Sequence, residues 1–555
     1  MRVLIASAML AALLVQPARA LDTARELAVS GAARLALARV EQLQPRDSAA
    51  PRWGEWEALR LTLLVRLKQN EDALNRVAAL PVKLPAADLR SCLLEGARAA
   101  IAVGKAQDAR GYVARLLWQL DATPAEARAA RLLIIESQVL ERQGDAAFRS
   151  MLRFEQDFRP LDLAVAERFV EALLDLGQDR QAVNWLSRVD EASPQRLRLQ
   201  LRTGLVAPET AVAQARARTA KGGAAGYWHV MAEAAAIQKS GALRVESLEH
   251  VLHDSEGDAR RLDTLAGELW QGYLAEAQSA ANRGGLLAGD DTAWLDLASR
   301  QLGGDPVQSR AMFAYLSRHG GARDVRMGAQ LQLVFSLAQS GLDRTALRLF
   351  GDGAADADGL DPQARYLLGN IAETRGSPAA AARFWQGIPT PPGVGADEWQ
   401  MRLATVQWSA RMTDAAAATV RGLAKSGKPL SSPALGRAVA LARDMRDAGR
   451  PELAQETLAA LLPLAAREHS REGLQVLGEI AESGGQYARA ADYYLRAALA
   501  NSTGDALALQ ARLAAGVNLA RAGYKEDARA QFQWLIQNAK DVVQRNAAQR
   551  ELSRL

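Results

Sequence analysis

The sequence predicts an all-α protein, a superhelical solenoid built from antiparallel helix pairs. Two observations support this prediction. Alanine, leucine and arginine, which favour helices, dominate the 555 residues, whereas aromatic residues make up only 5%. A motif also recurs along the chain: an apolar helix, a glycine, a short polar turn, an alanine five residues after the glycine and a large apolar residue four further on.

The first 20 residues are typical of a cleaved export signal. Arg2 precedes an apolar stretch from Val3 to Val15, and Ala18-Arg19-Ala20 supplies small residues at the spacing that a signal peptidase needs. An apolar stretch of 13 residues is too short to cross a hydrocarbon core of about 30 Å. We therefore expect a signal peptide over residues 1–20 and a mature periplasmic chain that starts near Leu21 and does not span a membrane.

Cysteine content and charge exclude several classes of protein. Cys92 is the only cysteine, so no intrachain disulfide forms, and it lies too far from the leader to carry a lipid anchor. Its neighbours Leu93 and Leu94 favour a buried, inert thiol. A net charge of +5 is close to neutral for this length and does not predict a nucleic-acid partner.

Each element of the recurring motif has a structural purpose. Glycine ends the first helix in a left-handed conformation, alanine lets the second helix approach closely, and the bulky residue is expected to fill the gap between neighbouring units. The glycines are separated by 35, 73, 36 and 38 residues, and the long gap holds a further unit around Met412 and Ala417. The sets are Gly341, Ala346 and Phe350; Gly376, Ala381 and Trp385; Gly449, Ala454 and Leu458; Gly485, Ala490 and Tyr494; Gly523, Ala528 and Phe532.

At these residues the chain resembles the tetratricopeptide repeat (TPR) family. That resemblance implies a right-handed superhelix, and it covers residues 325 to 555. A second, weaker match runs from Leu368-Gly369 to the terminal Ile388-Pro389. The best match consists of Leu477-Gly478, Ala481, Gly485, Tyr487, Ala490, Tyr494 and Ala497.

The pattern is less regular nearer the amino terminus. Gly144 and Gly241 occupy turn positions, but Arg149 and Glu246 replace the expected alanines. We therefore predict degenerate TPR-like repeats over residues 21–304 and TPR repeats over 305–555, about 14 units of roughly 34 to 38 residues in one uninterrupted superhelix. Three sets in this half still fit: Gly31, Ala36 and Val40; Gly104, Ala109 and Val113; Gly177, Ala182 and Leu186.

One irregular stretch suggests a recognition patch. Two tryptophans, a tyrosine and paired acids surround a glycine-rich segment, and such side chains can present a binding surface. The alternative is an inter-helix loop in which Asp290 or Asp291 caps the helix that contains Trp294. The candidate residues are Trp270, Tyr273, Asn282, Asp290, Asp291 and Trp294.

Motifs for catalysis and for metals are weak. No nucleophile, zinc-protease or phosphate-loop signature is present, so we predict neither an enzyme nor a cofactor. Glu246, His250 and His253 have a spacing that could ligate zinc, but a solvated face fits better. Residues 352–359 alternate aspartate with alanine and glycine like a calcium loop, yet Arg365 stands where the last carboxylate belongs. We therefore expect no metal.

A stacked-helix groove suits an extended peptide or a partner's helix. Together with export, this predicts a non-catalytic periplasmic scaffold that binds protein partners in cell-envelope assembly or exopolysaccharide export, an outer-membrane exporter among them. The first alternative is a carbohydrate-binding solenoid whose tryptophans stack on a polysaccharide, although Trp385 and Trp534 fall at packing positions. The second is an enzyme like the lytic transglycosylases, but repeats occupy the region where its catalytic domain would lie.

Overall fold

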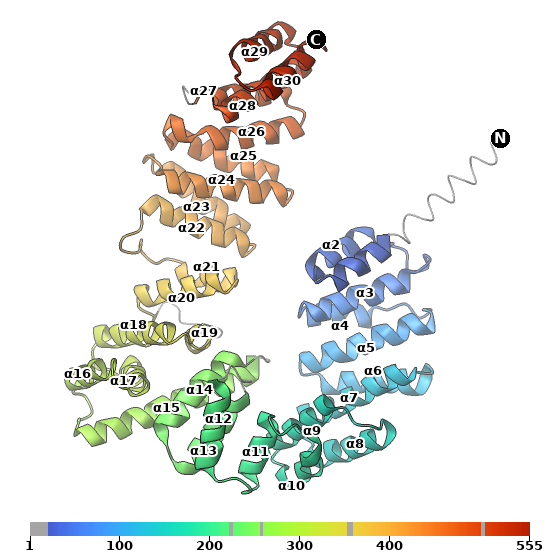
Figure 1. The fold of residues 1–555 in the computed structure, drawn as a ribbon, viewed down its shortest axis with the longest axis vertical. Helices are drawn as coiled ribbons and strands as arrows, with labels where there is room; N and C mark the ends of the chain where they lie inside the picture. Colours follow the sequence, from blue (N-terminus) through green and yellow to red (C-terminus); the bar gives the residue numbers. More distant parts are fainter. Residues whose placement is uncertain (1–19, 221–225, 256–258, 352–358, 501–504) are drawn as a thin grey trace, which may run out of the picture. The chain divides into compact units, whose positions relative to one another are not determined.

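The computed structural model of the chain describes residues 20–220, 226–255, 259–351, 359–500 and 505–555. The expected leader lies outside these residues, apart from Ala20. Two compact units divide the chain, one ending at Leu269 and the other beginning at Trp270. The described residues are helical throughout, apart from turns and one isolated bridge between Leu430 and Ala465. Helices that follow one another in the sequence pack side by side within each unit (Figure 1).

The first unit stacks helix pairs from a helix at residues 20–29 onward. In one pair the second helix is short and continues as a 3-10 helix, η1. The helices are α2 Ala33–Leu43, α3 Trp53–Arg66, α4 Asn70–Ala78, α5 Ala86–Ala102, α6 Ala106–Gln119, α7 Pro124–Leu140, α8 Gly144–Asp157, α9 Leu163–Asp175, α10 Asp179–Ala182, η1 Val183–Arg188, α11 Pro194–Arg202, α12 Pro208–Thr219, α13 Gly226–Gln238 and α14 Gly241–Asp254.

The longest helix, α15 Ala259–Gly284, contains the division between the two units. The pairs of the second unit are more regular in length. They are α16 Asp291–Gln301, α17 Pro306–His319, α18 Arg323–Gln339, α19 Asp343–Phe350, α20 Pro362–Thr374, α21 Pro378–Trp385, α22 Ala396–Ser409, α23 Thr413–Lys425, α24 Ser432–Asp447, α25 Pro451–Leu461, η3 Leu462–Leu464, η4 Arg467–His469, α26 Arg471–Ser483, α27 Tyr487–Leu499, α28 Ala506–Arg521, α29 Lys525–Asn538 and α30 Val542–Leu552.

The turn between paired helices has the backbone that the sequence pattern implies. Gly341, Gly376 and Gly485 each have a φ of 72°, and Gly523 has 88°, in the left-handed region that favours glycine. Five residues after them, the alanines are fully buried, which lets the second helix lie close to its partner. Relative exposure is 0% at Ala346, Ala381, Ala490 and Ala528.

The bulky residue of the motif packs against its own pair. At Trp385 it also fills the gap to the next pair, as expected, because its ring centroid lies 5.1 Å from that of Trp399 in α22. A Cβ added to Gly369 would lie 1.9 Å from Nε1 of Trp385, and one added to Gly478 would lie 2.6 Å from Cε1 of Tyr494. Each glycine is on the first helix of the pair whose second helix carries the ring. Phe532 packs on Gly516 in the same way, and Phe350 is also buried.

In some turns between helices, an arginine or lysine takes the left-handed conformation that glycine takes elsewhere. Arg142 and Lys239, rather than Gly144 and Gly241, take the left-handed conformation, at φ of 57° and 55°. Arg142 restores the motif, because the alanine five residues later is then Ala147, which is fully buried. Two further turns show the same substitution: Lys68 with Ala73, and Arg411 with Ala416, one residue before the Met412 and Ala417 predicted.

Arginine side chains join successive helix pairs within each unit. Many of their ion pairs link residues about one repeat apart, so the same contact recurs along the stack. Ion pairs at a protein surface contribute about 0–1 kcal/mol each, so the more exposed of these pairs favour the register of stacking more than they add stability. Examples are Arg25–Glu55, Arg90–Glu126, Arg110–Glu141, Arg198–Glu233, Arg375–Asp343, Arg471–Asp505 and Arg521–Glu482.

The glycine under the ring is the most demanding position in a pair. Gly478→Ala places a methyl group against Tyr494 and is expected to lower the free energy of unfolding by about 1–3 kcal/mol. Gly436→Ala, an exposed helical glycine with no neighbour within 4 Å of its added Cβ, is the control and is expected to raise stability slightly. Urea unfolding of both variants measures the difference. Equal stabilities would contradict the close approach.

The left-handed arginine predicts a stabilising change. Arg411→Gly removes a side chain from a conformation that costs an L-residue about 1–2 kcal/mol, so it is expected to raise the unfolding free energy by about 0.5–1 kcal/mol. Gly376→Ala makes the reverse change at a turn with a φ of 72° and should lower it. Thermal melts of the two variants test the sign. A destabilised Arg411→Gly protein would show that this arginine supports the turn.

Candidate binding groove

The three aromatic side chains of the predicted patch lie in the core. Relative exposure is 9% at Trp270, 0% at Tyr273 and 3% at Trp294. The Trp294 ring stacks on Tyr315 with centroids 4.2 Å apart, and its Nε1 donates to the carbonyl oxygen of Leu287 at 3.0 Å. These rings therefore offer no open face for a ligand.

The polar residues of the same stretch hold local structure. Helix α15 continues to Gly284, so the loop before α16 is shorter than the sequence suggested. Asp290 caps α16 by accepting from the amide of Ala293 at 3.1 Å, which is the alternative interpretation of this residue. Asp291 accepts from the amide of Gly321 at 2.8 Å, and Asn282 is exposed. A binding role for this stretch stays a prediction without an exposed aromatic ring to support it.

Two of the three residues considered for zinc contact other partners. His250 stacks on Trp228 with ring centroids 3.8 Å apart, and Glu246 pairs with Arg216 at 2.9 Å. In the part of the chain that the structure describes, no three His, Cys, Asp or Glu residues gather as a metal site would need. Seven of the eight residues of the calcium-like segment, 352–358, lie outside that part.

The single thiol is buried as its neighbours suggested. Cys92 has a relative exposure of 0%, and burial, together with nearby carboxylates led by that of Glu57, raises its pKa to about 12. The thiol is therefore neutral at physiological pH. A neutral, covered thiol is a poor nucleophile, so Cys92 belongs to the packing of the first unit.

A groove of about 390 Å³ lies in the first unit and is bordered mainly by α7 and α9. Both are first helices of their pairs, and the other helices contribute one lining residue each: Ile101 of α5, Met151 of α8 and Arg261 of α15. The volume is at the lower end of the range of about 300–1,000 Å³ typical of ligand pockets, enough for a few side chains. The lining is Ile101, Leu132, Ile135, Glu136, Val139, Leu140, Met151, Arg168, Phe169, Glu171, Ala172, Asp175 and Arg261.

The floor of the groove is apolar and its rim is accessible. Ile135, Met151 and Phe169 are buried, with relative exposures of 4%, 0% and 2%. Val139 is half-buried and Leu140 is 37% exposed, although both are aliphatic. Apolar side chains left open on the face of a repeat that packing does not use are a feature of partner-binding surfaces.

Charges around the groove are mostly paired. Glu136 forms an ion pair with Arg168, and Asp175 pairs with Arg198 of α11 at 3.1 Å. Glu171 is half-buried and makes no hydrogen bond or ion pair with any described residue. The groove therefore combines an apolar floor with one carboxylate, that of Glu171, that forms no ion pair with a described residue.

The groove was not predicted from the sequence, because its lining contains neither a glycine of the repeat motif nor a tryptophan. A signal was present in the residues 132–140, where apolar side chains cover more of the helix than one buried stripe requires. The motif itself was also displaced there, because Arg142 rather than Gly144 makes the turn.

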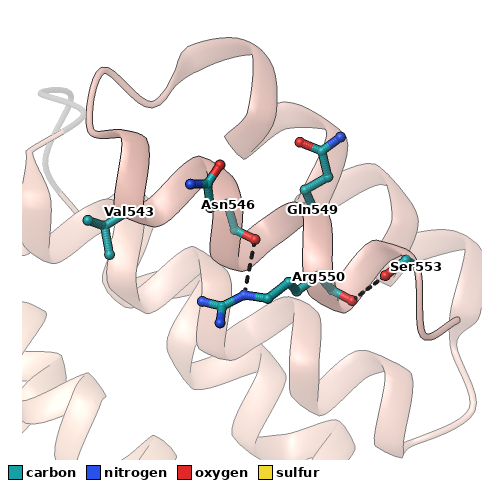
Figure 2. Close-up of a pocket in the computed structure, with 5 residues that line it drawn as sticks. All are labelled: Val543, Asn546, Gln549, Arg550 and Ser553. Atoms are coloured by element: carbon teal, nitrogen blue, oxygen red, sulfur yellow. Dashed lines mark hydrogen bonds between the residues drawn. The ribbon is translucent and has the colours of Figure 1, made fainter.

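A second depression, of about 580 Å³, lies on the last helix. Figure 2 shows its lining along α30, where Nε of Arg550 donates to the carbonyl oxygen of Asn546 at 3.4 Å and the Ser553 hydroxyl donates to that of Arg550 at 2.8 Å. The lining residues are exposed, and four of them are polar.

Tryptophan exposure bears on the carbohydrate alternative. Among the 11 tryptophans, all within the described ranges, Trp118 of α6 is the only exposed one, at 76%. Trp385 is fully buried as predicted, and Trp534 is half-buried beneath Arg512, whose guanidinium lies 3.8 Å from the ring centroid. Only Trp118 thus has an open face for stacking on a sugar ring.

The exposure of the tryptophans predicts how strongly acrylamide quenches the fluorescence of the protein. Trp118→Phe is expected to remove the component that acrylamide quenches most strongly, because the other indoles are at least half covered. Trp385→Phe should leave that component in place. Stern–Volmer titration measures both variants. Persistence of strong quenching in Trp118→Phe would show that another indole is open in solution.

Within the described part of the chain, no helix combines the length and apolar character needed to cross a membrane. The sequence matches no protein-family model and no curated protein. Similar solved structures include Naa15/Naa10 bound to HypK-THB, with 12% identity, 97% of this chain and 100% of that chain covered, and a TM-score of 0.21. The Cut9–Hcn1 hetero-tetramer of the APC/C has 10% identity, 95% of each chain covered and a TM-score of 0.25. For yeast Tom70 the identity is 10%, the match covers 97% of this chain and 95% of that chain, and the TM-score is 0.21.

Likenesses at these scores carry no argument about function. The helix pairs, their left-handed turns and the buried alanines described above establish an all-α, TPR-like solenoid on their own.

Proposed function

We propose that this protein is a non-catalytic scaffold that holds a segment of a partner protein in the groove between α7 and α9. The observation that carries the proposal is the set of apolar side chains, Leu132, Val139 and Leu140, that line an open face of the stack. Burial of each such side chain by a partner is favourable by roughly 25 cal/mol per Å² of apolar surface. A rigid stack of helices also presents this face without ordering cost.

We also propose that the protein acts in the cell envelope. The export signal expected over residues 1–20 supports delivery to a periplasm, where the partners would belong to envelope assembly or exopolysaccharide export, an outer-membrane exporter among them. Fractionation tests this directly, since osmotic shock should release the mature chain together with a periplasmic marker. Retention with the cytoplasmic marker would contradict it.

A photo-crosslinking amino acid tests the groove in intact cells. Placed at Leu140, on the rim, it is expected to capture a partner protein, whereas at Leu163 of α9, which is 49% exposed but outside the groove lining, it should not. Val139→Arg fills the groove with a charged side chain and should abolish capture at Leu140. A melting temperature within a few degrees of the unmodified protein confirms that Val139→Arg still folds. Equal capture at both positions, or capture that survives Val139→Arg, would contradict the proposal.

Carbohydrate binding is a second candidate because of Trp118. Its ring is on the second helix of its pair and does not line the groove, so the two functions would use different surfaces. Aromatic stacking on a sugar changes indole emission. Polysaccharide that leaves the emission of the unmodified protein unchanged would remove this candidate.

A further inference from the structure

We propose that the groove selects a partner segment in which a lysine or arginine accompanies apolar side chains, with Glu171 of α9 as the residue that receives the cation. This inference rests on the proposed function and specifies the chemistry of the occupant. It follows from the charges of the lining, taken one at a time.

Two of the three carboxylates in the lining are already neutralised. Glu136 pairs with Arg168 across α7 and α9, and Asp175 pairs with Arg198. Glu171 lies between them on the same face of α9, three residues after Arg168 and four before Asp175, and has no hydrogen-bond donor among the described residues. A half-buried carboxylate without a donor loses hydration and gains nothing in return until a ligand supplies a positive charge.

The cations near the groove do not cancel this preference. Arg168 is engaged by Glu136. Arg261 of α15 is a second cation in the lining, but no ion pair joins it to Glu171, so it does not neutralise that carboxylate as Arg168 neutralises Glu136. Burial, with the neighbouring Arg198 and Arg261, lowers the pKa of His229 to about 4, so this imidazole is neutral and adds no positive charge at physiological pH. Glu171 is therefore the one carboxylate of the lining that remains for a cation of the ligand.

Apolar and ionic contacts would act together. Leu132 and Val139 of α7 and Ala172 of α9 cover the aliphatic part of the ligand, which excludes water from the ion pair with Glu171. A charge-assisted hydrogen bond in such surroundings is stronger than one on an open surface, because the dielectric response is weaker. Selectivity for the cation then comes from the carboxylate, and affinity comes from the apolar floor.

A phage-displayed library of random 12-residue peptides tests the proposal on the mature chain, residues 21–555. Peptides are first sorted by whether Val139→Arg abolishes their capture. Those that depend on the groove are expected to be enriched in lysine or arginine beside leucine, isoleucine or phenylalanine. For synthetic copies of these peptides, Glu171→Gln is expected to weaken binding about fivefold to tenfold. Glu171→Lys should reverse the charge preference of the selected peptides.

Glu167→Gln is the matched control. Glu167 lies one turn earlier on α9, is half-buried like Glu171 and is outside the groove lining. Removal of its charge should therefore change peptide affinity less than twofold. Groove-dependent peptides with no basic enrichment, or with affinity that Glu171→Gln leaves unchanged, would overturn this inference and leave the scaffold proposal standing. Failure to recover any peptide that depends on the groove would overturn both.

Discussion

The close approach of two helices at a small residue is the contact on which this fold depends. In the most regular pairs, a glycine of the first helix lies directly under an aromatic ring of the second, as at Gly478 and Tyr494, and an alanine such as Ala490 completes the contact. A pair packed in this way still exposes apolar surface on its outer sides. The next pair must cover that surface, so each pair is stable only as part of a stack.

Much of the fold follows from residues whose role is local. Glycine followed by alanine at the fifth place predicts a turn and a close contact from backbone geometry alone, and both are present at Gly376 and Ala381. The packing of Trp385 against the next pair was also expected, but its contact with Gly369 was not, because that contact depends on how the helices of one pair cross. Spacing along the chain does not specify which neighbour a bulky side chain meets.

The candidate site was harder to predict for the opposite reason. Trp270 and Trp294 were predicted to be binding residues. Large aromatic side chains gain most from burial, however, and both lie in the core. Val139 and Leu140 are residue types that are common in any helix. Only their position, on a face that does not pack against another helix, sets them apart. Which face of a helix remains open is a property of the stack, so a single sequence carries little information about it.

The groove lies where the repeat departs from its own pattern. Ile135 stands seven residues before the left-handed Arg142, the place that Gly369 holds before Gly376, and Met151 stands where Trp385 would. Both Ile135 and Met151 line the groove. Two side chains of medium size cannot interlock like a bare glycine and a ring, so space remains above them. The same substitution therefore weakens the resemblance to regular repeats and creates the concavity, which gives a physical reason for function to lie in the less regular half.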